Sequence, residues 1–208
     1  MLVHPWDAAT SDDEWRAWLA GRDFGQLIAP GADRDLPVVV PTHFVFDGDS
    51  TVWLHLARPN PVWEPLAERP RALLTVIDDY VYVPSDWNAI PGTAVEYGIP
   101  TSYYASVQLS CDVRVIDDPA EKAEVLNLQI GHFEPGSGRS PVSSATDPDR
   151  RSLPGLRAIE LSVTAATAKF KYGGNKDESH RRQIADQLSG RDGRSDAAAR
   201  GHLLRRLR

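Results

Sequence analysis

The chain has 208 residues, 41% hydrophobic and 25% charged, which is enough apolar material to bury a core and excludes disorder throughout. Its formal net charge of −6 argues against a protein that wraps nucleic acid, because such proteins usually carry an excess of lysine and arginine. The single cysteine, Cys111, excludes an internal disulfide and a cysteine metal cage. The first residues lack signal-peptide features, and no apolar run is long enough to cross a bilayer. We therefore expect a cytoplasmic protein with neither a membrane nor a nucleic-acid partner.

The first half of the chain predicts one helix followed by short strands. Ser11 and Glu14 form a capping box that opens the helix expected over residues 11–20. Asn60-Pro61 is typical of an N-cap with proline in the first helical position, and predicts a second helix through Leu66. β-branched and aromatic runs predict strands over residues 24–29, 36–46 and 51–57, the last two joined as a hairpin, and two more within 72–83 that meet near Asp78-Asp79.

The second half predicts two long strands and a helical tail. Residues 101–116 alternate between apolar and polar side chains, as in a strand with one buried face. A helix is expected after Asp118, and a second long strand over 156–171. The helix carries an apolar stripe that consists of Leu126, Ile130 and Phe133.

The order of these elements favours a mainly β fold. About six strands dominate and no alternation of strand, helix and parallel strand occurs, so we expect an antiparallel barrel with helical decorations. The chain is predicted to be a single domain over residues 1–208, with a helix at 11–20, the barrel at 24–171 and C-terminal helices at 177–208.

Two of the six histidines are candidates for a site. None forms a close ligand pair of the HExxH kind, so a metal site built from side chains alone is poorly supported. His43 and His55 fall on the two strands of the expected hairpin, and His55 points away from an apolar face, toward either solvent or a pocket. A structural role for both remains open. His180 and His202 are expected to be solvated in the polar tail, and Cys111 to be a buried, inert thiol.

Two segments suit anionic groups. Arg58 and Asn60 lie beside the expected helix start, where unpaired amides favour negative charge. Lys169, Lys171 and Asn175 lie on either side of a glycine pair that lets the backbone approach closely or turn sharply, and such a basic loop could bind a phosphate or a carboxylate. A capped helix and a solvated turn, respectively, are the alternatives.

Several segments in the same order resemble the PaiB family of FMN-binding split-barrel proteins, often described as transcriptional regulators. They are PTH at residues 41–43, HLARPNPVW at 55–63, YVPSDW at 82–87, PT at 100–101 and FKYGGN at 170–175, the last followed by a charged helix. The resemblance implies a split β-barrel that forms a homodimer, with the cofactor in a groove at the subunit interface.

Departures from the family pattern suggest a subgroup. Ser102 and Tyr103 stand where the family has Trp and Asn, Gln108 where it has His, and Gly173-Gly174 where it has Ser-Gln. These changes predict a larger pocket. IPTSYYASVQ and KFKYGGN are similar to the piperazate synthases, heme enzymes of nonribosomal peptide biosynthesis that convert the amino acid N5-hydroxy-L-ornithine to L-piperazic acid.

The resemblance also implies roles for individual residues. His55 is the expected axial ligand of heme b, with His43 as the rival. Tyr104, Ser102 and Lys169 are expected to handle protons or bind the substrate carboxylate. The expected cofactor-binding residues are Thr42, Arg58, Asn60, Thr101, Lys171 and Asn175. The alternatives are an FMN-binding transcriptional regulator and a flavin or heme oxidoreductase of the broader split-barrel group.

Overall fold

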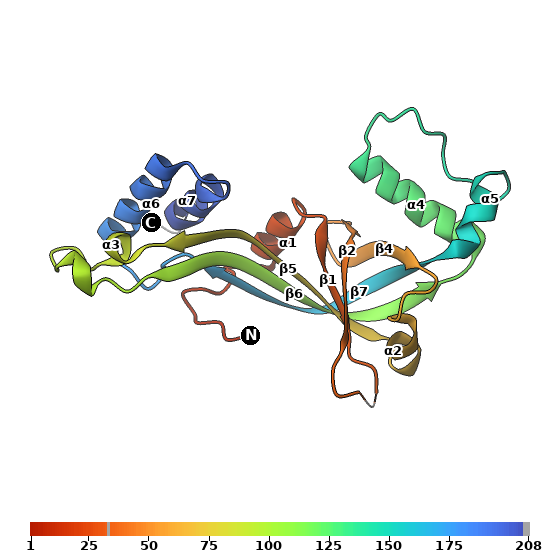
Figure 1. The fold of residues 1–208 in the computed structure, drawn as a ribbon, viewed down its shortest axis with the longest axis horizontal. Coiled ribbons are helices and arrows are strands. Elements are labelled where there is room, and N and C mark those ends of the chain that lie inside the picture. The colour runs from red at the N-terminus through yellow and green to blue at the C-terminus, as the bar shows by residue number, and fades with distance from the viewer. Residues whose placement is uncertain (33, 206–208) are drawn as a thin grey trace. The chain divides into compact units, whose positions relative to one another are not determined.

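A computed structural model describes residues 1–32 and 34–205 as a seven-stranded sheet with helices (Figure 1). The strand order is β2-β1-β5-β6-β7-β4-β3, so the sheet is not closed and β2 and β3 form its edges. The strands are β1 (Phe24–Ala29), β2 (Val38–His43), β3 (Val45–Phe46), β4 (Thr51–Ala57), β5 (Arg71–Val83), β6 (Thr101–Ile116) and β7 (Leu156–Lys171). The helices are α1 (Asp12–Leu19), α2 (Trp63–Glu68), α3 (Ser85–Asn88), α4 (Pro119–Phe133), α5 (Asp149–Ser152), α6 (Glu178–Arg191) and α7 (Asp196–Arg205), with single 3₁₀ turns η1 (Val95–Tyr97) and η2 (Leu153–Gly155). The predicted mainly β architecture with C-terminal helices is confirmed.

The chain divides into two compact units. Unit 1 comprises Met1–Trp15, Ile77–Val107 and Thr167–Arg208, and unit 2 comprises Arg16–Val76 and Gln108–Ala166. Strands β5, β6 and β7 contribute residues to both. The assignment of one domain to the whole chain stays a prediction.

In unit 2, β4 separates an apolar face from a polar one. Leu54 and Leu56 are buried, and Leu54 lies opposite the buried Ile159 of β7 in the antiparallel register. Helix α4 lies beside β4 (Figure 1). It begins where the Asp118 carboxylate accepts hydrogen bonds from the amides of Ala120 and Glu121. The face of β4 that carries His55 therefore has a helix next to it.

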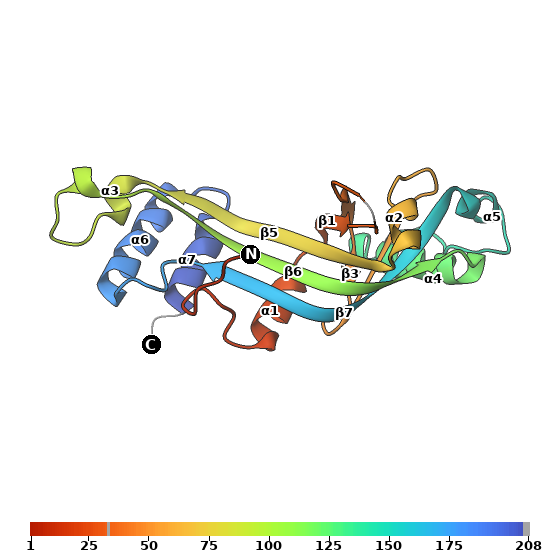
Figure 2. The same ribbon diagram turned by 90° about the horizontal axis from the view of Figure 1, so that it is seen from below.

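In unit 1, the C-terminal helices α6 and α7 pack side by side (Figure 2). Asp177 caps α6 by accepting from the amide of His180, and Ile184 and Leu188 are buried. In α7, Leu203 is fully buried. The tail therefore packs as part of the unit.

Four local predictions are wrong. His43 and His55 do not share a hairpin, because the run breaks at Phe44: β2 pairs with β1, and only the short β3 pairs with β4. Residues 72–83 form part of one continuous strand, in which Asp79 adopts a φ of 55° instead of ending the strand. Helix α2 begins at Trp63, two residues later than the Asn60-Pro61 signal implied.

The fourth wrong prediction is the capping box between Ser11 and Glu14. Glu14 reaches back one residue further than expected, since its carboxylate accepts from both the amide and the hydroxyl of Thr10 rather than from Ser11.

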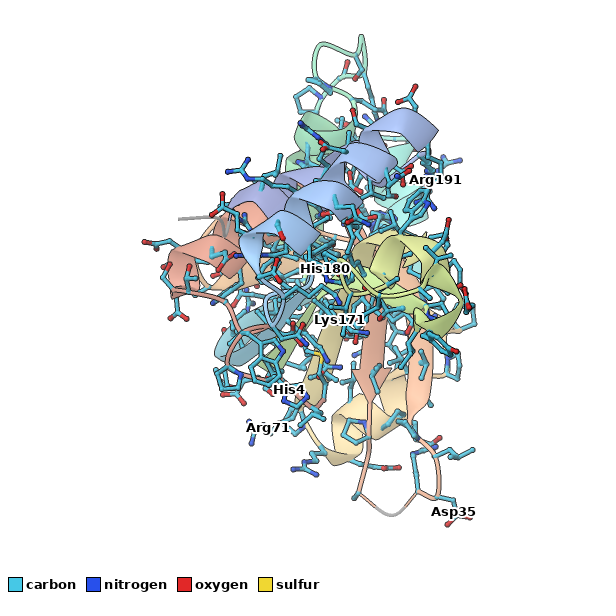
Figure 3. All side chains as sticks on the ribbon, turned by 90° about the vertical axis from the view of Figure 1, so that its left-hand side faces the viewer. His4, Asp35, Arg71, Lys171, His180 and Arg191 are labelled. Atoms are coloured by element: carbon cyan, nitrogen blue, oxygen red, sulfur yellow. The ribbon has the colours of Figure 1, made fainter. Side chains whose placement is uncertain are left out.

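The tail histidines are not solvated, contrary to expectation. His180, near the start of α6 (Figure 3), is only 3% exposed, and burial lowers its pKa. His202 is 8% exposed and its Nε2 lies 2.9 Å from Oδ2 of Asp79. The burial of His180 and His202 was not predicted, because their neighbours in the sequence are mostly polar or charged. Cys111 is buried as predicted, which raises the pKa of its thiol to about 12. Within the described part of the chain, no helix is both long and apolar enough to span a bilayer.

Candidate cofactor site

A cavity of about 390 Å³ in unit 2 contains both candidate histidines. His55 comes from β4 and His43 from the end of β2, and their ring centres are 5.1 Å apart in an edge-on arrangement. Helix α4 supplies most of the remaining wall, and the full lining is His43, His55, Leu126, Gln129, Ile130, Phe133 and Glu134. The predicted hairpin forms between β3 and β4 but does not include His43. The two histidines still meet, because strands from different parts of the sheet bring them together.

His55 is fixed by one hydrogen bond. Its Nδ1 lies 2.5 Å from Oε1 of Gln129, on the neighbouring α4. An amide oxygen only accepts, so Nδ1 carries the proton and donates. Among residues 1–32 and 34–205, no hydrogen bond to Nε2 of His55 is found. In the neutral ring this nitrogen keeps its lone pair.

His43 is held by ring contacts. Its ring meets those of His55 and Phe133 edge-on, the latter at 5.3 Å between centres. Burial, and after it the charge of His55, lower the pKa of His43. The lowered pKa favours the neutral ring of His43.

Apolar side chains from α4 form one wall of the cavity. Leu126, Ile130 and Phe133 were predicted as the apolar stripe of this helix; Leu126 and Ile130 are half-buried and Phe133 is exposed. Leu126 and Ile130 pack against the small core cluster of Ala123, Val142 and Leu153 while still lining the cavity. The stripe thus presents an apolar surface to whatever occupies the cavity.

Four of the predicted site residues lie together in unit 1. The Lys171 ammonium donates to Oγ1 of Thr101 at 3.0 Å. The Nζ atoms of Lys169 and Lys171 lie 5.7 and 5.9 Å from the ring centre of Tyr104. Lys169 also donates to the main-chain oxygen of Leu2 and is only 8% exposed. Two positive charges are therefore held around one phenol ring.

The other two predicted residues of this unit are less engaged. Ser102 is half-buried on β6 and Asn175 is exposed after β7. Their proposed roles stay predictions.

The glycine pair allows a turn and a close backbone approach, as expected, but Gly173 does not enlarge a pocket as predicted. A methyl group on Gly173, whose φ is +66°, would lie 2.6 Å from Oη of Tyr103, and one on Gly174 would lie 2.2 Å from the main-chain oxygen of Trp6. Tyr103 is 1% exposed. Around Gly173, therefore, the missing side chain makes room for the Tyr103 ring and does not open a pocket there.

The remaining predicted residues do not line the histidine cavity. The Arg58 guanidinium donates to Oδ1 of Asp117 at 3.0 Å and to the main-chain oxygen of Pro154 at 2.7 Å. Asn60 accepts from the amide of Val62, and the Thr42 hydroxyl donates to the main-chain oxygen of His43. A ligand carboxylate would have to compete with Asp117 for Arg58. Cofactor binding by these three residues stays a prediction.

Sequence reasoning missed Gln129. It is 3% exposed although it carries an amide. The signal was present: Gln129 follows Leu126 by three positions and precedes Phe133 by four, so it is a polar residue inside an apolar helical stripe.

Together, the open antiparallel sheet and the cavity between β4 and α4 define a split-barrel protein with a histidine-lined cavity. The family model described as "Putative FMN-binding domain" matches residues 1–165, so the chain belongs to this family of FMN-binding-domain proteins. No curated protein matches the chain.

Two solved structures support the fold assignment. The flavocytochrome Anf3 from Azotobacter vinelandii is 22% identical with a TM-score of 0.62, over 85% of this chain and 75% of that one. The FAD and heme binding protein from Mycobacterium smegmatis is 20% identical with a TM-score of 0.62, over 86% and 80% of the two chains. The split-barrel fold predicted from sequence is confirmed.

Proposed function

We propose that this protein binds heme through His55 and catalyses the closure of N5-hydroxy-L-ornithine to L-piperazic acid. The observation that carries the proposal is the His55–Gln129 pair in the cavity of unit 2, where Nδ1 is bonded and Nε2 keeps its lone pair. A neutral imidazole of this kind is a common protein ligand of heme iron.

The cavity residues fit a heme. Leu126, Ile130 and Phe133 offer an apolar wall to a porphyrin, and the imidazole offers a nitrogen to its iron. The rings of His43 and His55 lie edge-on with their centres 5.1 Å apart, and one of the two would hold the heme iron. His55 is favoured over His43 because a hydrogen bond orients it.

The reaction needs no external oxidant or reductant. The neutral α-amine attacks N5, the N–O bond breaks with its electron pair on oxygen, and one proton passes from the amine to the departing hydroxide to form water. When bound, heme iron supplies a Lewis acid that makes the hydroxylamine nitrogen electrophilic. The protein supplies positioning and proton transfer.

The lysine–tyrosine cluster of unit 1 suits carboxylate groups, those of the cofactor at Lys171 and that of the substrate at Lys169. Lys171 is half-buried and held by Thr101, so its ammonium is ordered before a carboxylate arrives. Tyr104, Ser102 and Lys169 remain the proposed proton carriers and carboxylate ligands. Lys171, Arg58, Asn60, Thr42, Thr101 and Asn175 remain proposed cofactor ligands.

A homodimer with the cofactor site at its interface is part of the proposal. Unit 1 exposes several large apolar side chains, as interaction surfaces do, namely Ile77, Tyr80, Tyr82, Tyr97 and Ile99, each at least 50% exposed. Light scattering after size-exclusion chromatography checks this point. A monomer at micromolar concentration with heme bound would contradict it.

Turnover tests the enzyme assignment directly. Heme-loaded protein is incubated with N5-hydroxy-L-ornithine, and the product is followed by mass spectrometry as the loss of one water. We expect ring closure by the wild type and none by His55→Ala, whereas Glu124→Gln, an exposed change on α4, should retain full activity. A heme-loaded wild type that leaves the substrate unchanged would contradict the proposal.

FMN binding is the second candidate, and the family match favours it. In that case the protein would be a flavin-binding regulator or a split-barrel oxidoreductase. Tight FMN binding without specific heme binding would select this candidate.

A further inference from the structure

Gln129 is a buried residue whose side-chain amide makes a single hydrogen bond among the described residues, to His55. Its side chain is enclosed in unit 2 at 3% exposure, and its Oε1 accepts from Nδ1 of His55. Its Nε2 has no hydrogen-bond partner within residues 1–32 and 34–205. Burying an amide costs free energy unless it is hydrogen-bonded, so an apolar residue would suit this position better if packing alone mattered.

The hydrogen bond determines which imidazole nitrogen the cavity meets. Neutral histidine carries one ring proton, and acceptance by Oε1 places that proton on Nδ1. The lone pair is then on Nε2. Without an acceptor at Nδ1, the ring would be free to exchange tautomers and to rotate about its side-chain bonds.

We propose that Gln129 is the positioning residue for His55: it fixes the Nδ1–H tautomer and the ring orientation, and it raises the basicity of Nε2 toward a heme iron. The inference rests on the proposed heme function for its consequence, but the tautomer itself does not depend on heme. Outer hydrogen bonds of this kind commonly tune metal-ligating histidines, and their loss lowers metal affinity about 10–100-fold.

The tautomer is tested without any cofactor. Nitrogen-15 NMR of histidine-labelled, full-length, heme-free protein at pH 7.5 should show His55 with its proton on Nδ1 and an unprotonated Nε2. In Gln129→Met, which keeps the size and removes the acceptor, the His55 signals should shift toward a tautomer mixture. A proton on Nε2 in the wild type, or unchanged His55 signals in the variant, would overturn the inference.

The influence on the iron is tested by resonance Raman spectroscopy of the ferrous heme-loaded protein. Gln129→Glu provides a charged acceptor and should raise the iron–histidine stretching frequency, whereas Gln129→Met should lower it and weaken heme affinity about tenfold. Glu124→Gln, on the exposed side of α4, is the matched control and should leave the frequency unchanged. Equal frequencies in all four proteins would contradict the proposed role.

The two proposals fail in different ways. If the wild type binds no heme, the proposed function fails, and the NMR result still decides the tautomer. If heme binds through His55 but neither the tautomer nor the stretching frequency responds to Gln129, the positioning role alone fails.

Discussion

Two histidines of this chain are held by hydrogen bonds in opposite ways. In unit 1, His202 has both ring nitrogens engaged: Nε2 donates to Asp79 at 2.9 Å, and Nδ1 accepts from Arg205 at 3.0 Å. Its ring also stacks on Tyr172 at 4.3 Å between centres. In unit 2, His55 has only Nδ1 engaged, and the ring borders a cavity. The comparison separates a histidine that holds structure from one that retains a lone pair for a ligand.

The largest difference between His55 and His202 is expected in the effect of their substitution on heme affinity. We expect His55→Ala to weaken heme binding by more than about 100-fold, because even the loss of an outer partner of a metal ligand costs about 10–100-fold. His202→Ala should leave heme affinity unchanged. Optical titration with heme measures both.

His43→Ala distinguishes the rival ligand. Its ring lies beside His55 without an orienting hydrogen bond among the described residues, so its loss should reduce affinity far less. A variant series in which His43→Ala abolishes the heme spectrum and His55→Ala does not would reverse the assignment.

For the free energy of unfolding, we expect the opposite order: His202→Ala should cost more than His55→Ala. His202→Ala removes the ring from a buried site and takes one partner from the Asp79 carboxylate, so the free energy of unfolding should fall by about 3 kcal/mol. His55 is half-buried, and His55→Ala should cost roughly 1 kcal/mol. Urea unfolding measures the difference, and equal losses in the two variants would contradict it.

The glycine at the end of β7 gives a smaller, structural effect. Gly173→Ala should cost roughly 1–3 kcal/mol, because φ is positive and a methyl group would lie 2.6 Å from Oη of Tyr103. In a Tyr103→Phe background that contact is absent, so the same substitution should cost less. An equal cost in both backgrounds, measured by thermal unfolding, would show that Tyr103 is not what requires the glycine.

The smallest expected effect concerns the lysine cluster. Lys171, which donates to Thr101, is a proposed cofactor ligand, so Lys171→Met should weaken heme binding about tenfold through the loss of a charge-assisted hydrogen bond to a heme carboxylate. Lys171→Arg should restore part of the affinity. Unchanged heme affinity in Lys171→Met, measured by optical titration, would show that Lys171 does not hold the cofactor.

The sequence predicted the regular elements well and the contacts between them less well. Residues 24–29, 101–116 and 156–171 form strands with the expected bounds, because alternation and β-branched composition act locally. The sequence did not predict that β5 is continuous, because Asp78-Asp79 is a typical turn signal. In the structure, Tyr172 and His202 bind Asp79, and these tertiary contacts override the local preference for a turn.

For the site, local pattern identified His55 and His43, but it could not show that Gln129 contacts His55 across 74 positions of sequence. Nor could it show that Tyr103 occupies the space beside Gly173. Both facts depend on packing between distant segments, which a single sequence does not encode in its local periodicity.

The absorption spectrum of the wild-type protein titrated separately with heme and with FMN tests the central claim most directly. The account predicts a saturable Soret band with heme at one equivalent per chain, lost in His55→Ala, and much weaker binding of FMN. A wild type that binds FMN tightly and gives only the spectrum of free heme would contradict it.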